Sequence, residues 1–291
     1  MSRTIRVTTY FLPVLITVSL LLGVSAAAAR TPVNPEEATG WTEKTLSKAN
    51  EYMISAANPH ASEAGLAILD AGGSAVDAAI AAQLVLSLVE PQSSGLGGGG
   101  FMVVFDATNQ QLRTYDARET APASSDISHF EVNGEVLSFW DAVNSGLAVG
   151  PPGLLRGLEK MHADGGRLPW AELFKPALKL AREGFAVSPR LHGLLQRSKK
   201  LRESQTARPY FYDDKGEPRP VGYVLKNPKL AEVLALVARQ GADAFYEADM
   251  RGLFGVRTMW CGATQFGSGN GNANTASVKP HQYSGIRAQF V

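Results

Sequence analysis

The sequence has a single cysteine, Cys261, among its 291 residues. One cysteine excludes an intrachain disulfide framework, so the fold must be held by its hydrophobic core. An excess of charge is also missing, because 28 lysines and arginines are balanced by 27 aspartates and glutamates, a formal net charge of +1. This balance gives no general basis for binding nucleic acid or an anionic membrane.

Metal-ligand spacing is absent as well. The five histidines show no H-E-x-x-H pattern: His60, His129, His162, His192 and His281. We therefore expect no metal site and no cofactor. Asp77 could be a buried functional carboxylate in an apolar segment, but its position at a helix start explains it as a partner of the helix dipole.

Residues 1–29 predict a secretory signal peptide. Arg3 and Arg6 form a basic region, residues 10–24 are apolar, and residues 25–29 are a small-residue cleavage site. The alternative is a membrane anchor, but a stable span needs roughly 20 apolar residues. We expect export to the periplasm or the extracellular space, with a polar linker over residues 30–50.

Four consecutive glycines, Gly97 to Gly100, stand between an apolar helical pattern and an apolar strand pattern. No side chain can pack at such positions, which predicts the close approach of another backbone or of a ligand. The spacing of Gly95, Gly97 and Gly100 also fits G-x-G-x-x-G. A dinucleotide loop, however, follows a strand and opens a helix, and the order here is the reverse.

Periodicity predicts a mixed α/β (α+β) fold in which helices cover a central sheet. The expected elements are a strand at 53–57, helices at 58–71 and 74–90, a hairpin of strands 101–106 and 111–116, helices at 153–163, 170–183, 189–197 and 228–240, and a surface hairpin or loop at 209–220. The helix at 74–90 is apolar on nearly every side, so it should be almost completely buried. Ser74 and Asp77 match the spacing of a capping box at its start.

Six motifs occur in order within this region. They are ANPHASEAG (57–65), GGSAVDAAIAA (72–82), VEPQSSGLGGGGF (89–101), DARETAP (116–122), GRLPWAEL (166–173) and EGFAVS (183–188). Together they make residues 51–250 resemble the large-subunit region of the γ-glutamyltranspeptidases. The resemblance implies an N-terminal nucleophile hydrolase fold, an αββα sandwich of two stacked antiparallel sheets, here incomplete.

Arg118 is the candidate substrate-binding residue. It follows the strand that ends at Asp116, and its planar fork of donors suits a free carboxylate. In the family that this region resembles, the arginine of the Arg-Glu-x-Ala-Pro motif holds the α-carboxylate of the γ-glutamyl group. The alternative is a structural ion pair with Asp116, Glu119 or another acid.

Glu90, Ser93 and Ser94 flank the glycine loop. Serines there are expected to cap backbone groups in a tight turn. A nucleophilic serine would need a nearby base, and no neighbouring residue supplies one.

The nucleophile that the resemblance implies is absent from this sequence. In the family it is the threonine of a Thr-Thr-His motif, freed by self-cleavage so that its own amino group acts as base. The only Thr-Thr pair is Thr8-Thr9 in the signal segment, and Thr258, Thr264 and Thr275 are not followed by Thr-His. We therefore expect no catalytic residue in this chain, inactivity on its own, and a small subunit of the same precursor as partner.

Residues 251–291 match no part of the family and contain no Asp or Glu. Six glycines and three asparagines between residues 252 and 274, without a periodic apolar face, predict disorder. Either a reading-frame shift or a natural tail would explain the abrupt change.

The resemblance implies a γ-glutamyltransferase or glutathione hydrolase precursor that acts on glutathione and other γ-glutamyl compounds. Two alternatives stay open. One is a cephalosporin acylase or γ-polyglutamate hydrolase of the same fold, although Arg118 favours a substrate with a free glutamyl α-carboxylate. The other is a non-catalytic secreted fragment.

Overall fold

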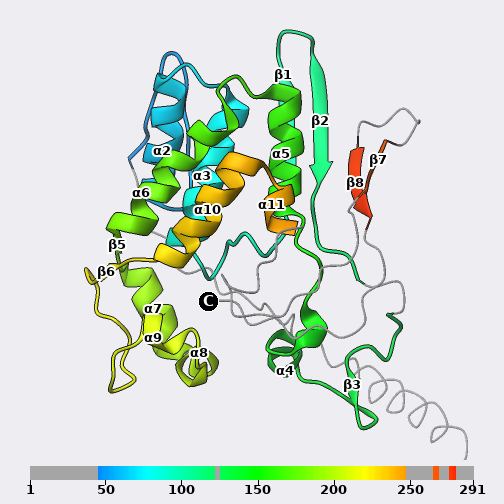
Figure 1. Ribbon diagram of the computed structural model, residues 1–291, viewed down its shortest axis with the longest axis vertical. Coiled ribbons are helices and arrows are strands. Elements are labelled where there is room, and N and C mark those ends of the chain that lie inside the picture. Colours follow the sequence, from blue (N-terminus) through cyan, green and yellow to red (C-terminus); the bar gives the residue numbers. More distant parts are fainter. Residues whose placement is uncertain (1–44, 122–124, 247–264, 269–274, 280–291) are drawn as a thin grey trace, which may run out of the picture. The chain divides into compact units, whose positions relative to one another are not determined.

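In the computed structural model, which describes residues 45–121, 125–246, 265–268 and 275–279, two helices joined by a glycine turn come first (Figure 1). Helix α2 spans Pro59–Asp70, and the side chain of Asn58 caps it by accepting from the His60 N–H at 3.1 Å. Gly72 then adopts a left-handed φ of +86° between the helices. The helix expected at 58–71 is thus confirmed.

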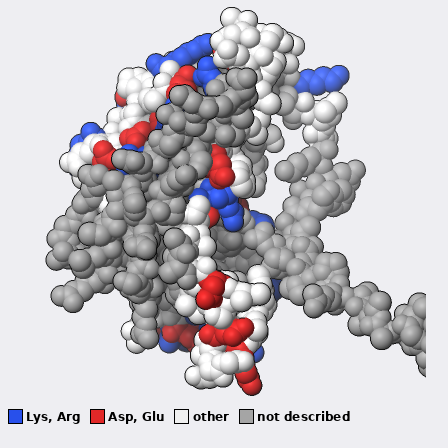
Figure 2. All heavy atoms as spheres, turned by 90° about the vertical axis from the view of Figure 1, so that its right-hand side faces the viewer, with Lys and Arg blue, Asp and Glu red and all other residues white. Residues whose placement is uncertain are grey.

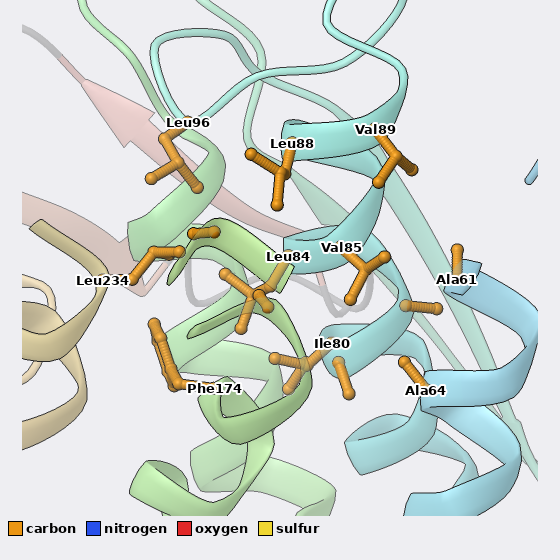
Figure 3. Close-up of a cluster of buried hydrophobic side chains, with 14 of the residues drawn as sticks. Ala61, Ala64, Ile80, Leu84, Val85, Leu88, Val89, Leu96, Phe174 and Leu234 are labelled. Atoms are coloured by element: carbon orange, nitrogen blue, oxygen red, sulfur yellow. The ribbon is translucent and has the colours of Figure 1, made fainter. Parts of the chain in front are cut away.

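Helix α3, Ala75–Val89, is the centre of the core. The predicted capping box of Ser74 and Asp77 begins it. Ile80, Leu84 and Val85 are fully buried in one hydrophobic cluster (Figure 3). Helices α2, α5 (Leu154–Gly165) and α6 (Lys175–Glu183) pack against it, which confirms the prediction that this helix is buried on nearly all sides.

Asp77 ties the start of α3 to a distant loop. Its Oδ2 accepts hydrogen bonds from the N–H groups of Ser74 at 2.8 Å, Arg167 at 2.9 Å and Leu168 at 3.1 Å. His162 lies 3.7 Å from its other carboxylate oxygen. These partners fit a capping and anchoring role rather than a catalytic one.

The predicted hairpin is present and has two different faces. Strands β1 (Phe101–Asp106) and β2 (Gln111–Asp116) pair antiparallel, with Phe101 opposite Asp116. On the inner face, Met102 and Val104 pack against the core and Tyr115 is buried in it. On the outer face, Phe101 keeps 70% of its surface exposed, and Val103, Phe105 and Leu112 are also exposed.

The sheet continues beyond the hairpin in the order β1-β2-β8-β7. Strands β7 (Gln265–Ser268) and β8 (Thr275–Lys279) pair antiparallel, and β8 runs parallel to β2 with Thr275 opposite Thr114. The expectation that residues 251–291 lack regular structure therefore fails for these two segments, since β8 pairs with β2 and β7 pairs with β8 despite the weak local pattern. The rest of that range lies outside the described residues.

The remaining described elements are short strand pairs and helices. They are β3 (Glu131–Val132) with β4 (Glu135–Val136), β5 (Phe185–Ala186) with β6 (Val224–Leu225), α4 (Phe139–Val143), η2 (Gly146–Ala148), η3 (Trp170–Phe174), α7 (Pro189–Arg197), α8 (Lys199–Glu203), α9 (Arg208–Phe211), α10 (Pro228–Gln240) and α11 (Asp243–Tyr246). The helices expected at 153–163, 189–197 and 228–240 are confirmed as α5, α7 and α10. The single helix expected at 170–183 is divided into η3 and α6, with Pro176 in the first turn of α6.

Two local expectations need correction. Residues 53–57 form no strand; the Ala56 N–H donates to the Ser62 Oγ at 3.1 Å instead of to a neighbouring strand. Of the surface hairpin or loop expected at 209–220, the hairpin is present, since Tyr212 pairs antiparallel with Pro218, but Tyr212 is buried rather than at the surface.

The predicted signal peptide, 1–29, lies outside the described residues. Among the helices that are described, none is both long and apolar enough to cross a membrane. On the face in Figure 2, basic and acidic side chains of the described residues both appear.

We predict that Asp77→Asn lowers the free energy of unfolding by about 2–3 kcal/mol, because a charged acceptor of three buried N–H groups is lost. Urea denaturation of the 291-residue chain measures this. Asp70→Asn is the matched control, since Asp70 is exposed and its carboxylate accepts from the Tyr52 hydroxyl at the surface. Equal effects of the two substitutions would contradict the anchoring role.

Candidate functional site

Arg118 projects from the end of β2 with most of its side chain exposed. The Asp116 Oδ1 accepts from the Arg118 backbone N–H at 3.0 Å, so this carboxylate is engaged by the main chain. The Arg118 Nε lies 3.4 Å from the Glu119 Oε2, and the side chain of Arg118 keeps 59% of its surface exposed. The guanidinium carries five donors, so it has donors available for a ligand beyond its contact with Glu119.

The glycine loop packs directly against the backbone beside Arg118. The Gly100 N–H donates to the Ala117 carbonyl at 3.3 Å, and the Ala117 N–H donates to the Gly100 carbonyl at 2.9 Å. A Cβ at Gly99 would collide with the Ala117 carbonyl oxygen and come within 2.8 Å of the Arg118 Cα. The predicted close approach is therefore real, and another backbone makes it.

The start of α5 completes this arrangement. The N–H groups of Gly153 and Leu154 both donate to the Gly98 carbonyl at 3.1 Å. A Cβ at Gly153 would also collide with the Ala117 carbonyl. Three segments far apart in the sequence thus meet at Ala117, the residue before Arg118.

Glu119 lies in a cradle of glycines. Its Oε2 is buried without a hydrogen-bond partner among the described residues. A Cβ at Gly98 or Gly99 would approach the carboxylate at 3.4 Å or 2.8 Å, and one at Gly150 would meet the Glu119 Cβ at 2.7 Å. The sequence indicated Glu119 only as a possible ion-pair partner of Arg118; nothing in the spacing of Gly150 revealed the cradle.

The residues before the glycine loop have other partners than expected. The N–H groups of Ser93 and Ser94 donate to the Glu90 carbonyl, as in a tight turn, but the two hydroxyls do not cap the backbone. The Ser93 Oγ accepts from Arg190 at 3.4 Å, and the Ser94 Oγ accepts from Gln83 at 2.5 Å. Arg190, nearly a hundred residues away, gave no signal in the sequence.

The other sequence candidates are placed as follows. Thr258 and Thr264 lie outside the described residues, and Thr275 opens β8. His60 is partly exposed and lies 3.6 Å from Glu63. Within the described ranges, no group of three or more His, Cys, Asp or Glu side chains could hold a metal ion.

Comparison with known proteins gives these motifs a family. A profile of the family Gamma-glutamyltranspeptidase matches residues 61–252, well over half of the chain. The chain belongs to the γ-glutamyltranspeptidase family. It is 38% identical over 206 residues to the glutathione hydrolase proenzyme of Bacillus subtilis, covering 70% of this chain and 35% of that protein.

Two solved structures have folds similar to that of this chain. The γ-glutamyltranspeptidase of Helicobacter pylori is similar with a TM-score of 0.67 and 30% identity, over 72% of this chain and 60% of that one. The cephalosporin acylase of Bacillus halodurans has a TM-score of 0.57 and 25% identity, over 74% of this chain and 42% of that one. The predicted fold class, that of the N-terminal nucleophile hydrolases, is confirmed by these similarities. The chain spans about a third of the length of the Bacillus subtilis relative.

We predict that Gly153→Ala destabilises the chain by about 1–3 kcal/mol, because the new methyl group must displace the Ala117 backbone. Thermal or urea unfolding measures the effect. Gly95→Ala is the matched control in the same loop system, since a Cβ there meets nothing within 4 Å, and we expect a change within about 0.5 kcal/mol. A neutral Gly153→Ala would show that the close contact with Ala117 is not a constraint.

Proposed function

We propose that this chain forms the γ-glutamyl-binding part of a γ-glutamyltransferase or glutathione hydrolase precursor. The observation that supports it is the exposed guanidinium of Arg118, which stands on a backbone fixed by the glycine loop and the start of α5. A fixed arginine fork can bind a free carboxylate through two parallel hydrogen bonds. The α-carboxylate of a γ-glutamyl group is such a ligand.

The neighbouring charge fits the rest of the same ligand. A γ-glutamyl group carries an α-ammonium as well as an α-carboxylate. The Glu119 Oε2 that lies 3.4 Å from the Arg118 Nε is buried, but the Glu119 side chain as a whole keeps 27% of its surface exposed. Charges of both signs therefore lie side by side at the site. We propose that Arg118 orients the carboxylate and that Glu119 adds attraction for the ammonium group.

The chemistry of the intact enzyme would transfer the γ-glutamyl group to a threonine and then to water or an amino acid. The residues of this chain bind and orient the donor, and the threonine with its base belongs to the small subunit. The 291-residue sequence has no Thr-Thr-His motif, so we propose that this polypeptide has no turnover by itself.

The outer face of the hairpin supports a contact with that small subunit. Phe101, Val103, Phe105 and Leu112 form an exposed apolar surface on β1 and β2. Side chains alternate across a strand, so Phe101 and its partner Asp116 lie on this same face. Asp116 precedes Arg118 by two residues. A polypeptide that covers the surface would therefore also border the Arg118 site.

Export is the remaining part of the proposal. Residues 1–29 have the basic, apolar and small-residue regions of a signal peptide. A periplasmic or extracellular enzyme would meet glutathione and other γ-glutamyl compounds there. Cleavage should leave a mature N-terminus between residues 27 and 31.

The alternative proposal, that the chain is part of a cephalosporin acylase, is supported by one structural similarity at 25% identity. It differs from the main proposal in what Arg118 must recognise. A substrate without a free glutamyl α-carboxylate would make no use of the exposed guanidinium, which is why we favour γ-glutamyl donors.

We predict that Arg118→Lys, in an intact precursor carrying this region, weakens binding of the γ-glutamyl donor by about 2 kcal/mol, or roughly thirtyfold. Lysine keeps the charge but cannot form the two parallel hydrogen bonds. The measurement is KM for a γ-glutamyl anilide, with Arg113→Lys as control because the Arg113 guanidinium bonds to the Asp164 carbonyl. Unchanged kinetics for Arg118→Lys would mean that Arg118 serves only its ion pair with Glu119.

We also predict that the purified 291-residue chain hydrolyses no γ-glutamyl anilide and does not cleave itself into two subunits. The physical reason is the missing N-terminal threonine, whose hydroxyl and amino group act together. Chromogenic assay and intact-mass spectrometry check both points. Activity of these 291 residues alone would overturn the proposal that the nucleophile comes from elsewhere.

A further inference from the structure

A charged network around one buried carboxylate lies where α3 leads into the glycine loop. Glu90, the C-cap of α3, is only 5% exposed. Its Oε1 accepts from the Asn58 Nδ2 at 2.8 Å, and its Oε2 accepts from the Arg190 Nη1 at 2.5 Å and from the Gln92 Nε2. Three donors from three parts of the chain thus meet one carboxylate.

The same network fixes the residues that lead into the loop. The Glu90 carbonyl accepts from the N–H groups of Ser93 and Ser94, each at 3.0 Å. Arg190 also reaches the Ser93 Oγ with its second terminal nitrogen at 3.4 Å. One guanidinium from α7 therefore bridges a side chain and a turn residue on the loop.

Between Glu90 and the Arg118 site, the loop is held by packing and by backbone hydrogen bonds. Leu96 is buried in the core cluster that contains Leu84 and Leu88 (Figure 3). Gly98 and Gly100 then make the backbone hydrogen bonds that hold α5 and Ala117. The loop is held by Glu90 at one end and by Ala117 at the other.

A buried ion pair is a costly way to gain stability, because desolvating two charges offsets much of their attraction. Only the carboxylate is deeply buried here, because the side chain of Arg190 keeps 31% of its surface exposed. Removing Arg190 is therefore strongly unfavourable, since the Glu90 charge stays buried. The pair therefore favours one geometry of residues 90–94 strongly over others, which is a property useful for orienting a site.

We propose that Glu90 and Arg190 are positioning residues for the Arg118 site and act through the glycine loop. Neither needs to touch the γ-glutamyl donor. The positioning step stands on the hydrogen bonds above, and only its consequence for ligand binding rests on the proposed function.

Hydrogen exchange of the 291-residue chain, followed by mass spectrometry, tests the positioning step. In Glu90→Gln and in Arg190→Gln we expect amides of the segments 95–100 and 117–121 to exchange about ten- to a hundredfold faster, the change expected when a charge-assisted hydrogen bond is lost. Amides of α10 should change much less. The double substitution should accelerate exchange only slightly more than Glu90→Gln does, because the two residues act as one unit.

Two further variants separate positioning from general weakening. Lys175→Gln removes an exposed ion pair with Glu172 on another helix, and exchange near Arg118 should not change. Arg190→Lys keeps the charge but cannot bridge Glu90 and Ser93 together, so it should restore part of the protection. Equal acceleration in α10 and in the glycine loop, or no acceleration near Arg118, would overturn the proposal.

Glutathione binding, measured by ligand-observed NMR on the same proteins, keeps the two proposals apart. If the unsubstituted chain binds glutathione, Glu90→Gln should weaken binding at least severalfold, and unchanged binding would contradict the positioning role. If the unsubstituted chain does not bind glutathione but the exchange result holds, the loop is positioned as inferred and the proposed ligand is wrong.

Discussion

The contact between the Ala117 carbonyl and the glycines of two separate segments is the constraint on which the site depends. Gly99 and Gly153 both come so close to this carbonyl that neither position has room for a Cβ. The Gly98 carbonyl meanwhile accepts from the first N–H groups of α5. Because strand end, loop and helix start are locked together at one residue, the next residue, Arg118, leaves the sheet in a defined direction.

The hydrophobic core supports this arrangement. Helix α3 is buried on nearly all sides, and its end leads through Glu90 directly into the glycine loop. Helix α5 packs against α3, and the N–H groups at its start donate to the Gly98 carbonyl, so core and loop share their supports. The outer face of β1 and β2, by contrast, exposes large apolar side chains. Inner packing thus fixes the backbone before Arg118, which we propose to be the binding residue, while the outer face is suited to a partner that we propose to be the catalytic half.

Local signals allowed much of this to be predicted. Asn58, Ser74 and Gly72 mark helix ends through short-range backbone chemistry, which depends on only a few neighbouring residues. The strand patterns of 101–106 and 111–116 likewise predicted the hairpin, but not that its outer face would expose large apolar side chains. The four glycines predicted the close approach of another backbone or of a ligand, without saying which of the two, or which backbone, it would be.

Long-range partners could not be predicted in this way. Arg190 and Glu90 are a hundred residues apart, and nothing local in either marks the other. The cradle of Glu119 depends on Gly150, which follows a separate helical segment. The composition of residues 251–291 predicted disorder, yet β7 and β8 form within that stretch. Composition could not reveal them, because the pairing of β8 with β2 is a tertiary effect.

The most direct test of the central claim compares two ligands on the unsubstituted chain. Glutathione carries a free α-carboxylate on its γ-glutamyl group, and a γ-aminobutyryl analogue of glutathione lacks that carboxylate but keeps the amine. Titration by NMR should show binding of glutathione at least roughly thirtyfold tighter than binding of the analogue, the difference expected for a charge-assisted arginine fork. Equal affinity for the two ligands would contradict the assignment of Arg118 as the residue that recognises the γ-glutamyl group.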